Sequence, residues 1–172
     1  MKKHLKKKNI ILEESSLISP SPVKMVVNLK GNIFKNCLKY RQNSKNVDHF
    51  SSDKGNLNEI IAELENGLTI ATTHLSFVPF VNVFQLNRLI SSLKKLPGLP
   101  VIVGDLNLPA NIPSKVSRFK SLISQPTYPS WKPKIQFDYI MVANKQNVQA
   151  KPISTIKPSI SDHVPIGVEL NF

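Results

Sequence analysis

The chain has 172 residues, of which 23 are Lys or Arg and 11 are Asp or Glu, so its formal net charge is +12. Hydrophobic residues make up 41% and charged residues 20%, a composition that indicates one globular domain rather than a disordered chain. No stretch approaches the roughly 20 apolar residues of a membrane-spanning helix. The single cysteine, Cys37, excludes an internal disulfide framework and an all-Cys metal site.

The excess of positive charge favours a polyanionic partner, and nucleic acid is the first candidate. A chain from a lysine-rich proteome shows the same excess without binding anything, so the charge alone leaves both interpretations open. Five lysines fall within residues 2–8, and we expect them to form a solvated tail rather than a specific site. Only Ile10–Leu12 follow before Glu13, which is too short for the apolar region of a secretion signal, so we expect a cytoplasmic protein.

Taken in chain order, residues 1–56 are rich in Lys, Asn and Ser, and we expect a degraded or irregular N-terminal part of the domain there. Within it, residues 42–53 have the composition of a solvated loop. The pattern becomes clearer from residue 57 onwards. Apolar runs at residues 60–64 and 68–75 flank Asn66-Gly67, which predicts a β-hairpin.

A helix is predicted next, because apolar residues recur at helical spacing from Phe80 to Leu96, where Pro97-Gly98 ends the pattern. Residues 99–103 form a short continuous apolar run that predicts a buried strand. A weaker helical pattern covers residues 114–123. Two further strands are predicted at residues 137–142 and 167–171, and strands with interposed helices indicate a layered α/β domain.

Four polar clusters stand at the ends of the predicted strands, where rigid scaffolds present functional groups. A site built from them contains three carboxylates, one carboxamide and two imidazoles. Oxygen ligands from Asp and Asn suit Mg²⁺, Mn²⁺ or Ca²⁺ rather than Zn²⁺. The clusters are Thr73-His74-Leu75, Gly104-Asp105-Leu106-Asn107, Phe137-Asp138-Tyr139-Ile140 and Ser161-Asp162-His163.

This inventory favours metal-assisted hydrolysis of a phosphate ester, in which two histidines act as general acid and base. Acyl transfer is not favoured, because the chain has no Gly-x-Ser-x-Gly elbow. Each cluster alone also has an ordinary structural interpretation: Gly104-Asp105 as a turn, His74 as a core histidine, Ser161-Asp162 as a cap. Asp138 is less ordinary, since a carboxylate inside an apolar strand needs a partner.

Together and in this order, the four clusters resemble the motifs of the endonuclease/exonuclease/phosphatase superfamily. The resemblance covers residues 57–172, and the stretch Pro126–Trp131 is similar to the bacterial members. It implies a four-layered α/β sandwich of the deoxyribonuclease I-like type, with residues 57–172 as its catalytic half. It also implies cleavage of phosphoric esters with Mg²⁺ or Mn²⁺ as cofactor.

The resemblance implies a role for each histidine. His163 is expected to be the general base that deprotonates the attacking water, and Asp138 the partner that holds its imidazole. His74 is expected to be the second histidine, which stabilises or protonates the substrate on the phosphate side.

The remaining polar residues are expected to form the floor of the site. Asp105 and Asn107 would contact the scissile phosphate, the nucleophile or a metal. Asp162 is expected to bind the metal together with Asp105. Asn107 would share the substrate phosphate with His74.

The N-terminal part departs from the superfamily pattern. Members begin with a strand that ends in Asn, followed by a strand and the Glu that is the principal metal ligand, but only 73 residues precede His74 here. Asn9–Leu12 and Leu17–Pro20 resemble a later segment of the family, so we expect a truncated domain that lacks both residues. The alternative interpretation takes Ile10–Leu12 as the degraded strand and Glu13 as the metal-binding Glu.

Three functional hypotheses follow for the whole chain. The first is a metal-dependent hydrolase of phosphoric esters. The second is a non-catalytic, basic remnant that binds nucleic acid. The third is one half of a split enzyme, for which a partner chain supplies the missing N-terminal strands and the Glu. The motifs do not distinguish DNA, RNA, phospholipid and small phosphoesters as substrates, although the basic charge favours nucleic acid.

Overall fold

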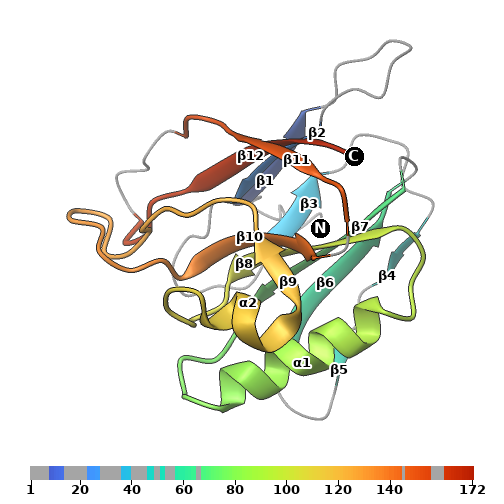
Figure 1. The fold of residues 1–172 in the computed structure, drawn as a ribbon, viewed down its shortest axis with the longest axis horizontal. Coiled ribbons are helices and arrows are strands. Elements are labelled where there is room, and N and C mark those ends of the chain that lie inside the picture. Colours follow the sequence, from blue (N-terminus) through green and yellow to red (C-terminus); the bar gives the residue numbers. More distant parts are fainter. Residues whose placement is uncertain are drawn as a thin grey trace, which may run out of the picture.

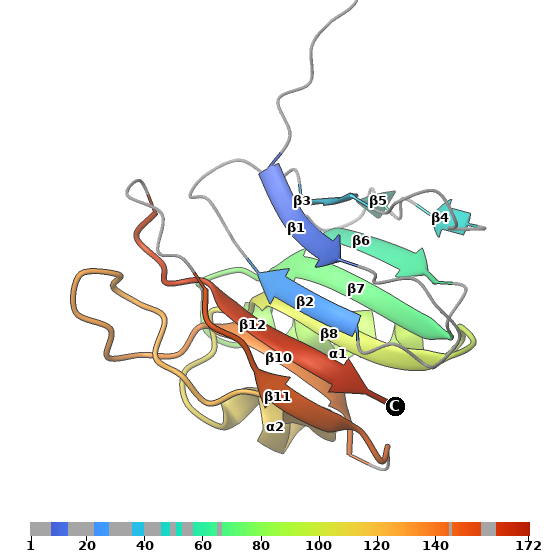
Figure 2. The ribbon, with the colours of Figure 1, turned by 90° about the horizontal axis from the view of Figure 1, so that it is seen from above.

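The computed structural model describes residues 61–64, 67–144, 146–155 and 161–172, and the backbone of the strands between residues 8 and 60. Its strands form two sheets that pack face to face, and two helices cover the outer face of one of them (Figures 1 and 2). No helix in the described residues is long and apolar enough to cross a membrane.

The first sheet has five strands in the order β11-β12-β2-β1-β3 and joins the two ends of the chain. β1 runs parallel to β3, and the other neighbours are antiparallel. The strands are β1 (Lys8–Glu13), β2 (Val23–Val27), β3 (Asn36–Lys39), β11 (Gln149–Pro152) and β12 (Ile166–Asn171).

The second sheet has the order β4-β6-β7-β8-β10-β9, and the short strand β5 pairs with β6 beside this path. β7 and β8 are parallel, and helix α1 makes the crossover that a parallel pair requires. The elements are β4 (Asn46–Asp48), β5 (Ser51–Ser52), β6 (Leu57–Glu63), β7 (Leu68–His74), α1 (Val81–Leu93), β8 (Leu99–Asp105), β9 (Phe119–Ser121) and β10 (Asp138–Ala143).

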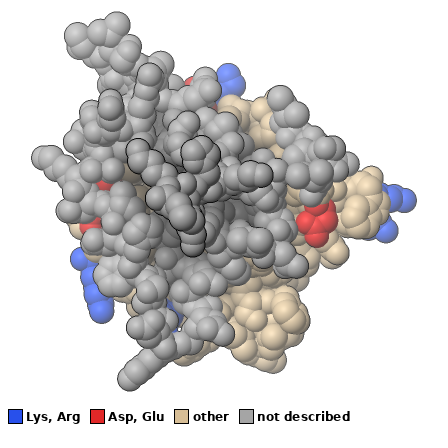
Figure 3. Space-filling view, turned by 180° about the vertical axis from the view of Figure 1, so that it is seen from behind, with Lys and Arg blue, Asp and Glu red and all other residues tan. Residues whose placement is uncertain are grey.

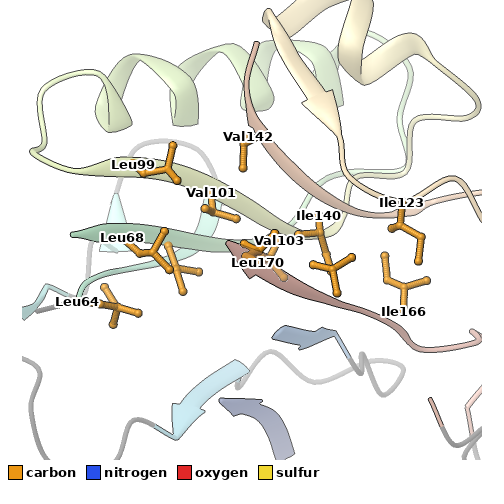
Figure 4. Close-up of a cluster of buried hydrophobic side chains, with 13 residues drawn as sticks. Leu64, Leu68, Leu99, Val101, Val103, Ile123, Ile140, Val142, Ile166 and Leu170 are labelled. Atoms are coloured by element: carbon orange, nitrogen blue, oxygen red, sulfur yellow. The ribbon is translucent and has the colours of Figure 1, made fainter. Parts of the chain in front are cut away.

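The main core lies between the two sheets (Figure 4). Val101 and Val103 of β8 point into it and meet Val168 and Leu170 of β12, whereas Ile102 points to the opposite face. This alternation follows from the two-residue repeat of a strand. It fixes which residues of β8 face the first sheet.

A second core lies between the second sheet and the helices. Leu86, Leu89, Ile90 and Leu93 of α1 are spaced three and four residues apart, so they share the face that packs on the sheet. The short helix α2 (Ile112–Ser117) follows β8 on the same side (Figure 1).

Most predicted elements from residue 57 onwards are confirmed. The hairpin around Gly67 corresponds to β6 and β7, and the helix predicted from Phe80 to Leu96 corresponds to α1. The strands predicted at residues 99–103, 137–142 and 167–171 correspond to β8, β10 and β12.

Two expectations are wrong, and one strand was missed. The helix predicted at residues 114–123 ends at Ser117, because Arg118 takes a left-handed conformation and Phe119 enters β9 beside β10. The predicted loop at residues 42–53 contains β4 and β5, which pair with β6. The pattern also gave no sign of β11, whose residues are mostly exposed.

The mixed α/β class is confirmed, with two sheets and one helical layer in the described residues. Among these residues no helix covers the outer face of the first sheet. The fourth layer therefore stays a prediction.

Gly104 is required where β8 passes β7. Its φ is +148°, and a Cβ added there would overlap the backbone oxygen of Thr73. We expect Gly104→Ala to destabilise the fold by about 3 kcal/mol, from strain and overpacking together. Gly67→Ala is the control, since φ is +85° there but the space is open, and about 1 kcal/mol is expected. Urea unfolding measures the free energy of unfolding of both variants. Equal losses of stability would contradict the close approach of β8 to β7 at Gly104.

Candidate active site

Three neighbouring strands of the second sheet bring polar side chains to one edge. In the parallel pair His74 lies opposite Asp105, and in the antiparallel pair Asp138 lies opposite Asp105. Directly paired residues share a face of a sheet. Asp105 continues the alternation of Val101 and Val103, so all three polar residues lie on the face towards the first sheet.

The fourth polar residue comes from the other sheet. His163 precedes β12, and its Nδ1 lies 2.7 Å from Oδ2 of Asp138, a carboxylate that is 2% exposed. The hydroxyl of Ser161 accepts a hydrogen bond from the backbone N–H of His163 at 3.2 Å. This loop is tied to the one before β10, because the N–H and the hydroxyl of Ser130 donate to the carbonyl oxygens of Asp162 and Ser161.

The two imidazoles converge on one carboxylate oxygen. Nε2 of His74 lies 3.6 Å from Oδ2 of Asp105, and Nε2 of His163 lies 3.9 Å from the same atom. The other oxygen of Asp105 accepts a hydrogen bond from the backbone N–H of Asn107 at 2.9 Å. Oδ2 of Asp105 is therefore the atom that the site surrounds.

Asn107 is held in one orientation. Its φ is +48°, a left-handed conformation that Asn tolerates better than most residues, and its Nδ2 donates to the carbonyl oxygen of Leu75 at 2.8 Å. The buried side chain of Asn82 in α1 donates in turn to the carbonyl oxygen of Asn107 at 3.1 Å. These two hydrogen bonds fix both the side chain and the backbone of Asn107 beside Asp105.

Burial and neighbouring charges shift the pKa values of the site. Burial raises the pKa of Asp105 to about 7, and the charge of Asp138 adds to the rise. Burial and the nearby His163 lower the pKa of His74. Burial alone would lower the pKa of His163 too, but the hydrogen bond and charge of Asp138 outweigh it and raise that pKa overall.

Three side chains form a group that fits a metal ion. One ligand atom each from Asp105, Asp138 and His163 lie within 4.8 Å of one another. Two buried carboxylates at this distance are costly without a cation, and their oxygens are the ligands that Mg²⁺ and Mn²⁺ prefer. The donor set therefore fits the predicted type of metal.

Asp162 stands apart from this group. Its side chain is exposed, and the described metal-type group does not include it. Its charge nevertheless raises the pKa of both His163 and Asp105. The role of Asp162 as a metal ligand stays a prediction.

The register of the first sheet argues against Glu13 as the metal-binding glutamate. Glu13 lies opposite Lys24, and Lys24 lies opposite Glu169 near the far end of β12. His163 instead precedes Ile166, where β12 begins. The rise along β12 separates Glu169 from Ile166 by roughly 10 Å, so the backbone of Glu13 lies towards the end of the strand away from His163.

The sequence analysis missed the residues that support the site. The hydroxyl of Thr127 accepts hydrogen bonds from the N–H groups of Phe137 and Asp138, and the ring of Tyr128 lies 5.1 Å from that of His163. The stretch Pro126–Trp131 carried part of the family resemblance, which is the signal that could have assigned these roles. No sequence pattern points to the role of Asn82, since it lies inside an ordinary helical pattern.

Comparison of the sequence with profiles of known families finds no match, and comparison with curated proteins finds none either. Similar folds occur among solved structures. Truncated TDP2 from Caenorhabditis elegans matches with a TM-score of 0.54 and 15% identity, over 74% of this chain and 66% of that one. A mannosyl-6-phosphatase from Bacteroides thetaiotaomicron matches with a TM-score of 0.51 and 13% identity, over 67% and 57% of the two chains.

An endonuclease/exonuclease/phosphatase family protein from the same bacterium matches with a TM-score of 0.52 and 13% identity, over 66% of this chain and 53% of that one. The chain thus spans between 53% and 66% of the length of these three structures. It shares the mixed α/β fold of these structures, one of which is an endonuclease/exonuclease/phosphatase family protein. At these identities the likeness establishes the fold alone.

Replacing Asp138 tests the ion pair with His163. Asp138→Asn keeps a hydrogen-bond acceptor but removes the charge, so we expect the pKa of His163 to fall. Asp162→Asn removes the same charge from an exposed position and should lower that pKa less. Titration of the imidazole signals by NMR measures both, with a His163→Gln spectrum for assignment. If the pKa of His163 is the same in Asp138→Asn as in the parent, the pairing of His163 with Asp138 is contradicted.

The raised pKa of Asp105 makes the stability of the metal-free chain depend on pH. Its contribution is fully present below the unfolded value of 3.8 and is lost as the pH rises through about 7. We therefore expect Asp105→Asn to be more stable than the parent at pH 8, by on the order of 2 kcal/mol, but not at pH 4.

Urea unfolding in the presence of a chelator measures this difference. Asp162→Asn, at an exposed position, serves as the matched control and should change the pH profile much less, because its charge makes only the smallest contribution to the raised pKa of Asp105. Parallel pH profiles for the parent and Asp105→Asn would contradict the burial of an uncompensated carboxylate.

Proposed function

We propose that the chain is a metal-dependent hydrolase of phosphoric esters in which His163 is the general base and Asp138 its partner. The observation that carries the proposal is the 2.7 Å contact between Nδ1 of His163 and Oδ2 of Asp138, which leaves Nε2 directed towards the side of Asp105. The fold supports it, because the similar structures include a mannosyl-6-phosphatase.

Asp138 fixes the tautomer of His163. The buried carboxylate accepts a hydrogen bond from the protonated Nδ1, so the lone pair lies on Nε2, where it can take a proton from water. The same negative charge stabilises the imidazolium that forms. This explains why the pKa of His163 rises although the ring is partly buried.

Asp138 and His163 pair with each other, so we expect Asp105, with Asp162, to hold Mg²⁺ or Mn²⁺, and Asn107, with His74, to hold the phosphate. When bound, such a metal neutralises the charge that develops on the phosphoryl oxygens. The carboxamide of Asn107 is positioned for either ligand by its hydrogen bond to Leu75. A cation beside Asp105 would also restore the usual acidity of that carboxyl.

His74 is suited to the phosphate side of the reaction. Its lowered pKa keeps the imidazole neutral near pH 7, so it would donate a hydrogen bond to a phosphoryl oxygen rather than act as a fixed cation. Its Nε2 and that of His163 lie 3.6 and 3.9 Å from the same oxygen of Asp105, so both imidazoles can act on a group bound there.

Nucleic-acid binding without turnover is the second candidate function, and the net charge of +12 is the observation that favours it. Its signature would be binding that weakens steeply with salt in the absence of cleavage. A split enzyme completed by a partner chain is the third, and there turnover would appear only after that chain is added. Nucleic acid is the substrate class that the charge favours for an active enzyme.

A cleavage assay with plasmid DNA and bis(4-nitrophenyl) phosphate, with Mg²⁺ or Mn²⁺, tests the proposal. We expect metal-dependent turnover that His163→Ala lowers by about 10²- to 10⁴-fold, since it removes the general base. His49→Ala is the matched control, because His49 belongs to none of the four motifs. Full activity in His163→Ala, or no turnover from a folded chain, would overturn the proposal.

A further inference from the structure

A run of exposed apolar residues lies directly beyond the site, between β7 and the first turns of α1. Phe77, Phe80 and Phe84 are 82%, 85% and 66% exposed, and Val78 and Val81 are each 43% exposed. We call residues 77–84, which comprise the connection after β7 and the first turn of α1, the phenylalanine loop. Folded chains rarely present five consecutive apolar residues to water, as residues 77–81 do here, unless the surface binds something.

The phenylalanine loop is fixed to the site. The backbone N–H of Ser76 donates to the side-chain oxygen of Gln85 at 2.7 Å, and the side chain of Asn82 donates to the carbonyl oxygen of Asn107. Phe80 has a φ of +67°, a conformation that a bulky residue rarely adopts. The chain therefore accepts backbone strain at a residue whose ring it leaves in solvent.

A second aromatic side chain stands at the same edge of the sheet. Trp131 is 72% exposed in the loop that leads into β10, and Lys132 and Lys134 beside it are exposed too. β7 ends at His74 and β10 begins at Asp138, and both residues flank Asp105 in the register. The two loops thus leave the sheet on either side of the site (Figure 1).

The segment that carries both loops has a strong excess of basic residues, although the exposed Asp162 also lies near the site. Residues 66–137 contain one acidic residue, Asp105, which is buried, and eight basic residues. On the face opposite to that of Figure 1, both Lys or Arg and Asp or Glu side chains appear at the edges of the described surface (Figure 3). Lys132 and Lys134 lie in the loop with Trp131, whereas Lys94 and Lys95 follow the far end of α1, and Lys120 pairs with Val142 at the end of β10 away from Asp138.

We propose that this edge docks on the surface of an anionic phospholipid bilayer. Phe77, Phe80 and Trp131 enter the headgroup boundary, and Lys132 and Lys134 face the anionic headgroups. Exposed phenylalanine and tryptophan side chains combined with basic residues are the combination that binds such interfaces. Docking goes beyond the proposed hydrolysis, because binding is measured without turnover.

The aliphatic members of the loop favour a bilayer over a nucleic acid. Single-stranded nucleic acid stacks its bases on the flat faces of aromatic rings. The exposed valines at residues 78 and 81 offer no such face. Their free-energy gain comes from leaving water for an apolar environment, which the acyl boundary of a bilayer provides. The one hydroxyl at the start of the loop, that of Ser76, accepts a hydrogen bond from the N–H of Val78.

Co-sedimentation with vesicles tests the proposal, with equal parts of phosphatidylglycerol and phosphatidylcholine against phosphatidylcholine alone. We expect the full chain to bind the anionic vesicles more tightly. The double variant Phe77→Ser/Phe80→Ser should bind them at least about tenfold more weakly, because two rings no longer enter the apolar boundary. Phe172→Ser, at an exposed phenylalanine outside the loop, is the matched control and should bind as the parent does.

Trp131 supplies a second readout, since it is the only tryptophan in the chain. Its fluorescence should shift to shorter wavelength with anionic vesicles, and the double variant should lose this shift while keeping the parent's thermal unfolding midpoint. Binding by the double variant equal to the parent's, or no binding to either vesicle, would overturn the proposal. Phenylalanine-dependent binding of a single-stranded oligonucleotide without vesicle binding would overturn it in favour of nucleic acid.

Discussion

The hydrogen-bonded pair of His163 and Asp138 is the interaction on which the site depends, because it joins the two sheets at their common edge. Asp138 begins β10 in one sheet, and His163 precedes β12 in the other. The inter-sheet core sets the spacing between these strands, so packing far from the edge determines whether the imidazole reaches the carboxylate. The same packing brings Nε2 of His163 to within 3.9 Å of Asp105.

The site concentrates negative charge that the fold does not balance. Asp105 and Asp138 are 5% and 2% exposed, and the nearby imidazoles offset only part of the cost. A sequence selected for stability alone would place apolar residues at these strand ends, as it does at Val101 and Val103. Two buried carboxylates beside two histidines are therefore the mark of a site that binds a cation or moves protons.

The sequence predicted which polar residues come together better than it predicted the framework around them. His74, Asp105, Asp138 and His163 were identifiable because each follows or opens a strand with clear periodicity, and the structure brings them together. The strands at residues 46–48 and 51–52 were not, since such short edge strands are set by pairing with β6 rather than by their own composition. The hydrogen bond from Asn82 to the carbonyl oxygen of Asn107 joins residues from different elements, so no local sequence pattern could predict it.

The most direct test of a metal site between the histidines is paramagnetic broadening of the imidazole NMR signals by Mn²⁺. The account predicts that substoichiometric Mn²⁺ broadens the signals of His163 and His74 together, and that Asp105→Asn abolishes the effect. Signals from both rings that stay sharp as Mn²⁺ is added would contradict a metal site at Asp105, and with it the proposed hydrolase.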